Sequence, residues 1–219
     1  MSASNDATRR PLPIAVLVSG GGRTIQNLAD RIAAGTLDAD IVCVISSQPK
    51  RYRVARVGGR EYPAVAMPLK EYASREAYSA AVFDRLRDAG AELVVLAGWL
   101  NKLVIPDDFA GRIINIHPGL LPSFGGQGMY GHHVHEAVLA AGCKVSGCSV
   151  HFADQEYDTG PIIVQQCVPV RDDDDPDALA ARVFEAECEA YPRAIQLIAE
   201  GRVRVEGNIT RIEHRGGGT

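Results

Sequence analysis

Residues 112–124 read RIINIHPGLLPSF, and this stretch decides the fold that the sequence predicts. An apolar, largely β-branched run leads to His117. Pro118 then ends the strand, because proline has no amide hydrogen and restricts the residue before it to extended geometry. Side chains two residues apart on a strand share one face. Asn115 and His117 are therefore expected side by side at the end of a strand.

An amide beside an imidazole is a pairing suited to acyl transfer. The amide of Asn115 can hold a carbonyl oxygen while negative charge builds on it. His117 can move a proton at the same centre, because histidine titrates near neutrality. The alternative is that Asn115 caps a turn and that His117 is a packed, hydrogen-bonded core residue. These two residues alone leave both interpretations open.

The chain has 219 residues, of which 46% are hydrophobic, and this is enough for one well-formed core. We expect a single domain over residues 14–212, between a flexible leader at 1–13 and a flexible tail at 213–219. The five cysteines include no CxxC pair, which favours reduced, mostly buried thiols. The leader has no apolar segment typical of a signal peptide, so a cytoplasmic protein is predicted.

Charge and hydropathy limit the classes of partner. The formal net charge is -4 and the sequence has no long run of Lys or Arg, which argues against a nucleic acid or an anionic membrane as the main partner. No apolar run approaches the roughly 20 residues that cross a bilayer. Small molecules are the expected partners, and both a monomer and a homodimer remain open.

A glycine-rich turn follows the first predicted strand, residues 14–19. It contains Gly22, Arg23 and Thr24 and leads into a predicted helix that ends at Gly35. Glycines let the backbone approach a ligand closely, and the free amides at a helix start favour an anion such as phosphate. Arg23 would add a charge-assisted contact. A tight turn that needs glycine for steric reasons is the alternative, because the motif is neither GxGxxG nor a Walker loop.

The remaining pattern predicts an α/β fold. Continuous apolar runs predict buried parallel strands, and the alternating runs at 144–153 and 161–170 predict an appended antiparallel pair. We expect a Rossmann-like open twisted sheet with a parallel N-terminal half and helices on both faces. The other predicted strands are 41–45, 64–67, 93–99 and 113–117; the other predicted helices are a short one before Gly58, one from the N-cap Ser74 to Gly90, one at 134–140, and one from Pro176 to about Glu200, followed by a hairpin.

Three histidines, His132, His133 and His135, follow a long glycine-rich loop at 125–131. No cysteine or carboxylate lies around them at zinc spacing, so no metal is expected. The aspartate run at 172–175 predicts that Asp175 caps a helix, because a calcium loop needs a glycine and a distal glutamate. The roles of the loop and of the three histidines stay open.

Two further segments are expected near the end of the strand that carries His117. Trp99 and the aliphatic residues after it follow a predicted strand, and ligand crevices of open α/β sheets form at such ends. Core packing is the alternative for Trp99. The turn at 154–161, DQEYDTGP, is acidic, and a carboxylate beside His117 would favour the protonated imidazole.

Four segments together resemble the folate-dependent formyltransferases. They are NIHPGLLP at 115–122, SVHFADQEYDTGPII at 149–163, the glycine-rich loop after the first strand, and SREAY at 74–78. The resemblance extends from Ile14 to about Arg211, and the branch that acts on glycinamide ribonucleotide is the most similar by chain length and C-terminal helix. It implies an enzyme of purine biosynthesis that transfers the formyl group of the co-substrate 10-formyltetrahydrofolate to an amine, without a metal.

The resemblance also implies the site residues. Asn115 matches the amide that stabilises the oxyanion, His117 the proton-transferring acid, and Asp158 the carboxylate that holds His117 charged. The residues implied to bind the phosphate and ribose of the acceptor are Gly22, Arg23, Thr24, Phe184, Glu185, Ala186 and Glu187. Those implied on the folate side are Arg75, Leu100, Asn101, Lys102, Leu103, His151, Asp154, Gln155, Glu156 and Tyr157.

One departure from the family leaves the acceptor open. The usual phosphate loop reads glycine, serine, asparagine, whereas this chain has Gly22, Arg23 and Thr24. Arginine would replace neutral donors to the phosphate, or it would indicate a different anion. A formyltetrahydrofolate hydrolase, a formyltransferase to another amine such as a sugar nucleotide, and a non-catalytic folate-binding module are the alternatives. The complete catalytic trio argues against the last of these.

Overall fold

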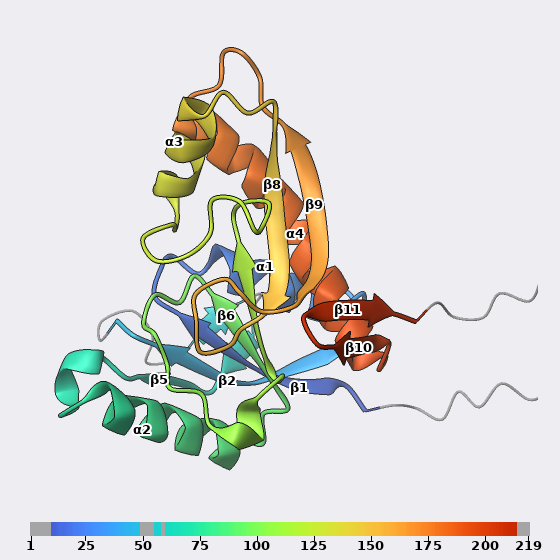
Figure 1. Cartoon of the computed structure of the whole chain (residues 1–219). Helices are drawn as coiled ribbons and strands as arrows, with labels where there is room; N and C mark the ends of the chain where they lie inside the picture. The colour runs from blue at the N-terminus through green and yellow to red at the C-terminus, as the bar shows by residue number, and fades with distance from the viewer. Residues whose placement is uncertain (1–9, 49–54, 58–59, 214–219) are drawn as a thin grey trace, which may run out of the picture.

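The computed structural model describes residues 10–48, 55–57 and 60–213, and its centre is a seven-stranded sheet (Figure 1). The first five strands across the sheet are parallel, and the last two are antiparallel to their neighbours. This arrangement confirms the predicted sheet with its appended antiparallel pair. The order across the sheet is β5 (Ala64–Ala66), β2 (Ala39–Ser46), β1 (Leu12–Val18), β6 (Leu93–Ala97), β7 (Ile113–His117), β8 (Val145–Phe152) and β9 (Ile162–Pro169).

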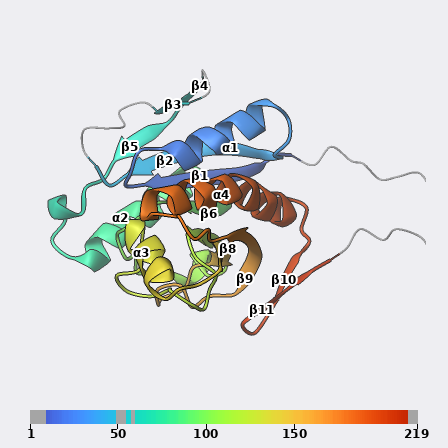
Figure 2. The same ribbon diagram turned by 90° about the horizontal axis from the view of Figure 1, so that it is seen from above.

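Helices lie on both faces of the sheet, as Figures 1 and 2 show. α1 (Arg23–Ala33) and α4 (Pro176–Ala199) lie side by side on one face, and α3 (His132–Ala140) packs against α4. α2 (Arg75–Asp88) covers the opposite face. Each face therefore has its own hydrophobic core, and the residues of β1 from Ile14 to Val18 are fully buried between the two.

The helix starts follow the predicted capping chemistry. Ser74 Oγ accepts a hydrogen bond from the Ala77 amide at 3.1 Å, and Asp175 Oδ1 accepts one from the Ala178 amide at 2.7 Å. α1 begins differently, because it follows Gly22 at a φ of 81° and no described side chain caps it. Its first amides are left without a side-chain partner, which suits the predicted anion site.

One predicted element is wrong. Residues 55–57, expected in a short helix before Gly58, form β3 (Ala55–Val57), which pairs antiparallel with β4 (Arg60–Tyr62). Two short runs on either side of a glycine pair are a hairpin pattern, and this signal outweighs the weak helical one. The rest of that predicted helix, and residues 1–9 and 214–219 of the predicted leader and tail, lie outside the described residues.

Smaller differences affect where elements begin. β1 begins at Leu12, two residues before the predicted start, and α3 begins at His132, two residues before Val134. The expected C-terminal hairpin is confirmed as β10 (Val203–Glu206) and β11 (Ile209–Ile212). The described residues also form two 3-10 turns, η1 (Leu69–Glu71) and η2 (Asp107–Phe109).

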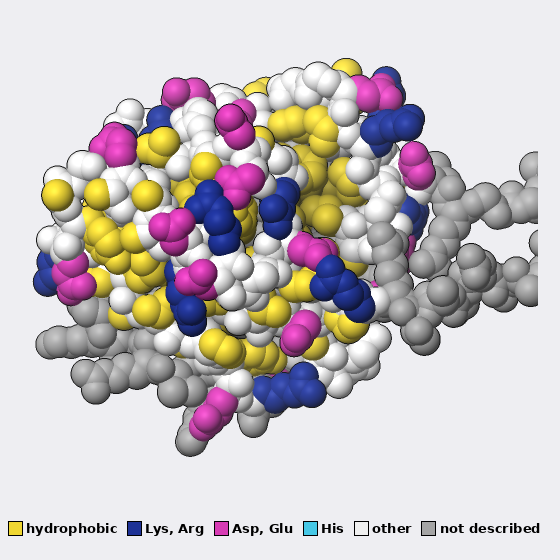
Figure 3. Space-filling view, turned by 90° about the horizontal axis from the view of Figure 1, so that it is seen from below, with side chains coloured by type: hydrophobic (Ala, Val, Ile, Leu, Met, Phe, Trp, Pro, Cys, Tyr) yellow, Lys and Arg dark blue, Asp and Glu magenta, His cyan; other side chains and the backbone are white. Residues whose placement is uncertain are grey.

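The surface seen from below carries basic and acidic side chains interspersed among apolar ones (Figure 3). Within the described residues, no helix is long and apolar enough to span a membrane.

Candidate active site

The carboxyl end of β7 holds the two residues from which the site is built. In the register of the sheet, Asn115 lies opposite His151 of the antiparallel neighbour β8, and His117 lies opposite Ser149. Asn115 Nδ2 is 3.3 Å from His151 Nε2. His151 Nδ1 donates to the Phe152 carbonyl at 2.9 Å, so in the neutral ring Nε2 is free to accept one hydrogen of the Asn115 amide. The second amide hydrogen of Asn115 remains available for a ligand.

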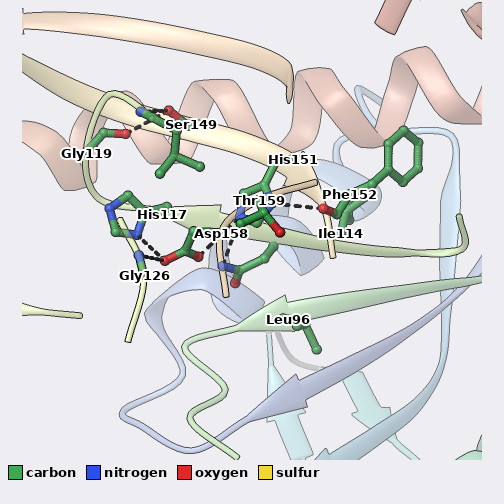
Figure 4. Close-up of polar contacts among 12 residues, drawn as sticks. Leu96, Ile114, His117, Gly119, Gly126, Ser149, His151, Phe152, Asp158 and Thr159 are labelled. Carbon is green, nitrogen blue, oxygen red and sulfur yellow. Dashed lines mark hydrogen bonds and ion pairs between the residues drawn. The ribbon is translucent and has the colours of Figure 1, made fainter. Parts of the chain in front are cut away.

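Asp158 joins these residues from the loop between β8 and β9 (Figure 4). Its Oδ2 atom is 3.6 Å from His117 Nδ1, and its Oδ1 atom is 3.5 Å from His151 Nε2. The Gly126 amide also donates to Oδ2, at 2.9 Å. The structure thus brings together the three residues expected to be catalytic, together with His151 from the predicted folate side, and it connects them to the long glycine-rich loop.

Two strained backbone positions supply the groups that face His117. Phe124 and Asp158, with φ of 54° and 59°, are the non-glycine residues with positive φ in the described part of the chain. The Phe124 carbonyl accepts from His117 Nε2 at 2.8 Å, and the Asp158 carboxylate faces Nδ1 on the other side of the ring. Such conformations are unfavourable by about 1 to 3 kcal/mol each and cluster at functional sites. The surrounding fold therefore stabilises an orientation that the local sequence alone disfavours.

Burial decides the charge of His117. Its side chain is 2% exposed, and burial lowers its pKa below the ordinary histidine value, although the charge of Asp158 and the Phe124 carbonyl act in the opposite direction. Asp158 raises the pKa of His117, as expected, but burial lowers that pKa by more. His117 is neutral at pH 7 as a result.

Asp158 is a carboxylate at the same pH. Burial acts to raise its pKa, but the contact with His151, the hydrogen bond from the Gly126 amide and the neighbouring His117 ring lower it below the ordinary aspartate value. A neutral imidazole beside a carboxylate is ready to accept a proton, because the charge that results is stabilised at once.

Side chains that the sequence reasoning missed hold the loop after β7. Ser149 Oγ donates to the Gly119 carbonyl at 2.7 Å and accepts from the Leu121 amide at 3.0 Å. Gln165 Nε2 lies 2.9 Å from both the Leu121 carbonyl and Ser149 Oγ. Ser149 and Gln165 lie opposite each other in the register of β8 and β9, so their side chains share one face of the sheet. Their place in the alternating pattern of the two strands is the signal that the sequence offered. These bonds fix Gly119 and Leu121, which follow Pro118, against the sheet.

Two cavities meet at Asn115 and Asp158, two of the residues predicted to be catalytic. The larger, of about 770 Å³, is lined by the glycine-rich turn, the end of β7, the loop before α3, and α4. The smaller, of about 80 Å³, lies on the side of β6 and the acidic turn. Residues shared by both walls are Trp99, Leu100, Asn115, Tyr157 and Asp158. A reacting group in either cavity can therefore reach the same amide and carboxylate.

The predicted site residues divide between these cavities. Gly22, Arg23, Thr24, His117, Phe184 and Glu187 line the larger one. Leu100, Asn101, Lys102, Leu103, His151, Asp154, Glu156 and Tyr157 line the smaller one. Residues 127–132 and His135, whose roles the sequence left open, also line the larger cavity.

Four predicted site residues lie outside both cavities. Arg75 and Glu185 are exposed, and Ala186 is buried in the core on the α4 face. Gln155 is exposed and its Nε2 donates to the Ile105 carbonyl at 2.8 Å. The helical geometry of α4 explains the split in that segment, because Phe184 and Glu187, three residues apart, share a face that the two residues between them do not.

An uncapped helix start and a cation face the larger cavity. The Arg23 guanidinium lies 4.0 Å from the centre of the Phe184 ring. Burial raises the pKa of Glu187, one turn along α4, to about 7, and the charge of Arg23 acts against that rise. Arg23 has no carboxylate within ion-pairing distance in the described part of the chain, so its charge is available to an anion.

Trp99 is both a core residue and part of the cavity walls, so both interpretations that the sequence left open apply to it. It is 8% exposed and stacks on Tyr78, with ring centres 6.4 Å apart, so it belongs to the core. It also lines both cavities. Beyond it, Lys102 Nζ is 3.3 Å from Glu156 and 5.3 Å from the Tyr157 ring centre.

No group of three or more His, Cys, Asp or Glu side chains within the described residues is placed to hold a metal ion. The arginine, amide and imidazole side chains in the cavity walls can bind phosphate, carbonyl and amine groups of a ligand.

The chain matches one known protein family along most of its length. The sequence model of the family "Formyl transferase" matches residues 12–195. A trifunctional purine biosynthetic protein adenosine-3 from Drosophila melanogaster is 39% identical over 93% of this chain, and this chain spans 15% of its length. A phosphoribosylglycinamide formyltransferase from Haemophilus influenzae is 34% identical, over 91% of this chain and 93% of that protein.

Solved structures share the fold. Glycinamide ribonucleotide transformylase 1 from Symbiobacterium toebii superposes with a TM-score of 0.84 and 38% identity, over 93% of this chain and 94% of that one. A formyltetrahydrofolate deformylase from Pseudomonas syringae pv. tomato gives a TM-score of 0.82 at 28% identity, over 92% of this chain and 65% of that one.

Proposed function

Because this chain belongs to the formyl transferase family, and within it to the phosphoribosylglycinamide formyltransferases, we propose that it transfers the formyl group of 10-formyltetrahydrofolate to the amine of glycinamide ribonucleotide in de novo purine biosynthesis. The observation that carries the proposal is the meeting of two cavities at Asn115 and Asp158. A transfer between two bound substrates needs two adjoining sites with the reactive groups at their junction.

The acceptor occupies the larger cavity. Its phosphate binds at the start of α1, where the amides after Gly22 lack a side-chain cap and Arg23 adds a positive charge. Glu187, which lines the same wall, accepts hydrogen bonds from the ribose hydroxyls. The glycinamide amine then points toward the end of β7.

The formyl donor occupies the smaller cavity and the surface around it. Trp99, Leu100 and Leu103 give an apolar wall for a flat heterocycle, and Asp154 and Glu156 offer acceptors for its N–H groups. The formyl group lies at the junction, beside Asn115.

The reaction uses the trio in sequence. The amine attacks the formyl carbon, and the Asn115 amide donates a hydrogen bond to the oxygen as it becomes negative. His117, neutral before the reaction, takes a proton from the attacking nitrogen and delivers it to the leaving nitrogen of the folate. The Asp158 carboxylate stabilises the imidazolium between these two transfers. The C–N bond to folate breaks, and tetrahydrofolate and the formylated amine are released.

We place this activity in the cytoplasm, with soluble small-molecule substrates, and in a monomer or a homodimer. The charge of -4 and the interspersed surface charges are consistent with small-molecule partners (Figure 3).

A hydrolase is the second candidate, because the same fold occurs in a formyltetrahydrofolate deformylase. The deciding experiment follows the absorbance of formyl-folate with and without glycinamide ribonucleotide. Turnover only when the acceptor is present supports formyl transfer. Turnover with water alone would instead identify a hydrolase, and folate binding without any turnover would identify a binding module.

A further inference from the structure

His135 is a histidine buried in the wall of the larger cavity. It belongs to α3 and is 4% exposed, while its neighbour His133 is exposed. It is among the residues that line the 770 Å³ cavity, next to the end of β7 and the loop before α3. The formyl-transfer steps proposed above do not use it, although a histidine at a buried helix position is less favourable than an aliphatic residue of similar size.

The two ring nitrogens of His135 have different surroundings. Nδ1 is fully buried and has no hydrogen-bond partner among the described residues. Nε2 is not among the buried, unpartnered atoms, and it makes no hydrogen bond to the part of the chain that the structure describes, so it is the nitrogen that meets the cavity. A buried N–H group without a partner is rarer and costlier than a buried acceptor without one. The proton of the neutral ring is therefore on Nε2, directed into the cavity.

The charge and position of the His135 ring limit which chemical groups of a ligand can bind to it. Burial lowers the pKa of His135 to about 4, and the charges of His132 and His117 act in the same direction. The ring is thus neutral at pH 7. Val134, the residue before His135, lies together with the His117 ring against Gly119, so this part of α3 approaches the end of β7. His135 lines the cavity with Asn115 and His117 and therefore belongs to its reacting end.

We propose that His135 binds the acceptor substrate by donating a hydrogen bond from Nε2–H to the carboxamide oxygen beside the reacting amine. This assignment rests on the proposed acceptor, which carries a carboxamide next to its amine. A neutral donor suits an uncharged carbonyl oxygen, whereas a phosphate would favour a cation. The bond would orient the amine toward the formyl group, so its loss would lower kcat/KM for the acceptor.

The main test compares three variants of the full chain. His135→Leu keeps the side-chain volume and removes the donor, His135→Gln keeps a donor, and His133→Leu changes an exposed residue of the same helix. We expect His135→Leu to lower kcat/KM for glycinamide ribonucleotide about tenfold, with the dissociation constant for formyl-folate unchanged. His135→Gln should recover most of that loss, and His133→Leu should match the wild type. Equal kinetics for His135→Leu and wild type would overturn the proposal, as would an equal weakening of formyl-folate binding.

A measurement on the unsubstituted protein covers the case in which His135→Leu does not fold. ¹H–¹⁵N spectra of the imidazoles report the proton on Nε2 of His135 directly. We expect this resonance to shift on addition of glycinamide ribonucleotide and not on addition of formyl-folate alone. An Nδ1–H tautomer, or no shift with the acceptor, would reject the proposal. If the wild type fails to turn over glycinamide ribonucleotide, the proposed function falls and this inference with it; if it turns over and His135 is silent, only this inference falls.

Discussion

His117 lies between the Asp158 carboxylate and the Phe124 carbonyl. Substitutions at His117 and at Asp158 therefore affect the same proton transfer. The ring contributes a proton acceptor near neutrality, and Asp158 contributes the charge that stabilises the protonated form. Both side chains act at one step of the proposed reaction, so their removal is not additive.

His117→Ala and Asp158→Ala should each lower kcat by about 10² to 10⁴ while leaving the fold intact, because each removes proton transfer or its electrostatic support. Rapid-quench measurement of the chemical step, with circular dichroism as the check on folding, gives the result. Near-wild-type turnover in either variant would refute the assigned roles.

Because the pKa of His117 is lowered, the rate of the wild-type protein should fall on the acid side only below about pH 6.5.

Arg23 tests the acceptor half of the site. Arg23→Ala should raise KM for glycinamide ribonucleotide about tenfold or more and leave formyl-folate binding unchanged, because it removes a charge-assisted contact to phosphate. Arg193→Ala, which removes an exposed arginine of α4, is the matched control. Steady-state kinetics with each substrate varied in turn would measure both. Equal effects on the two substrates would contradict a phosphate role.

At the level of elements, α1 and α4 are joined by a bond that a proline makes possible. Pro192 lies inside α4 and has no amide hydrogen, so it cannot bond to the Cys188 carbonyl four residues earlier. Asn27 Nδ2 of α1 donates to that carbonyl at 2.9 Å, and Arg31 does so at 3.3 Å. Tyr191, the residue before the proline, has its hydroxyl 2.9 and 3.0 Å from carbonyls of β6 and β7. α4 is thereby fixed to α1 and to the strands that end at the site.

A double-mutant cycle tests this account. Asn27→Ala should lower the free energy of unfolding by about 1 kcal/mol, because a part-buried carbonyl loses a donor. In a Pro192→Ala background the loss should be smaller, because the restored amide of residue 192 bonds to the same carbonyl. Urea denaturation of the four proteins gives the coupling. Strictly additive changes would show that the proline and the cross-helix bond are independent.

At the level of the whole molecule, buried histidines make stability depend on pH. In the unfolded chain His135 titrates near 6.5, and in the folded protein its pKa is about 4. Between these values the unfolded state binds the proton and the folded state does not, so stability falls as the pH drops from about 6.5 toward 4. Burial shifts the pKa of His117 in the same direction.

The expected loss of unfolding free energy between pH 7 and pH 4.5 is on the order of 2 kcal/mol from His135 alone. Urea denaturation at a series of pH values would show it as a slope. The slope should be shallower in His135→Leu, which has no titrating ring at that position. An unchanged slope in this variant would mean that other groups cause the acid sensitivity.

The sequence alone determined the parts of this protein that local chemistry controls. Buried strands, helix caps at Ser74 and Asp175, and the break at Pro118 follow from hydrophobic period, capping hydrogen bonds and the missing proline amide, all of which act within a few residues. The placement of Asn115 and His117 on one strand end follows in the same way.

Only the tertiary structure decided what depends on contacts between distant segments. It brought Asp158, in the loop between β8 and β9, to His117, with strained backbone at Asp158 and at Phe124 in the loop after β7. It made His117 neutral because burial outweighed the neighbouring charge. It also moved Arg75 away from both cavities and buried His135 in one of them. Side-chain burial and long-range distance are set by how the layers pack, and no local pattern in the sequence encodes them.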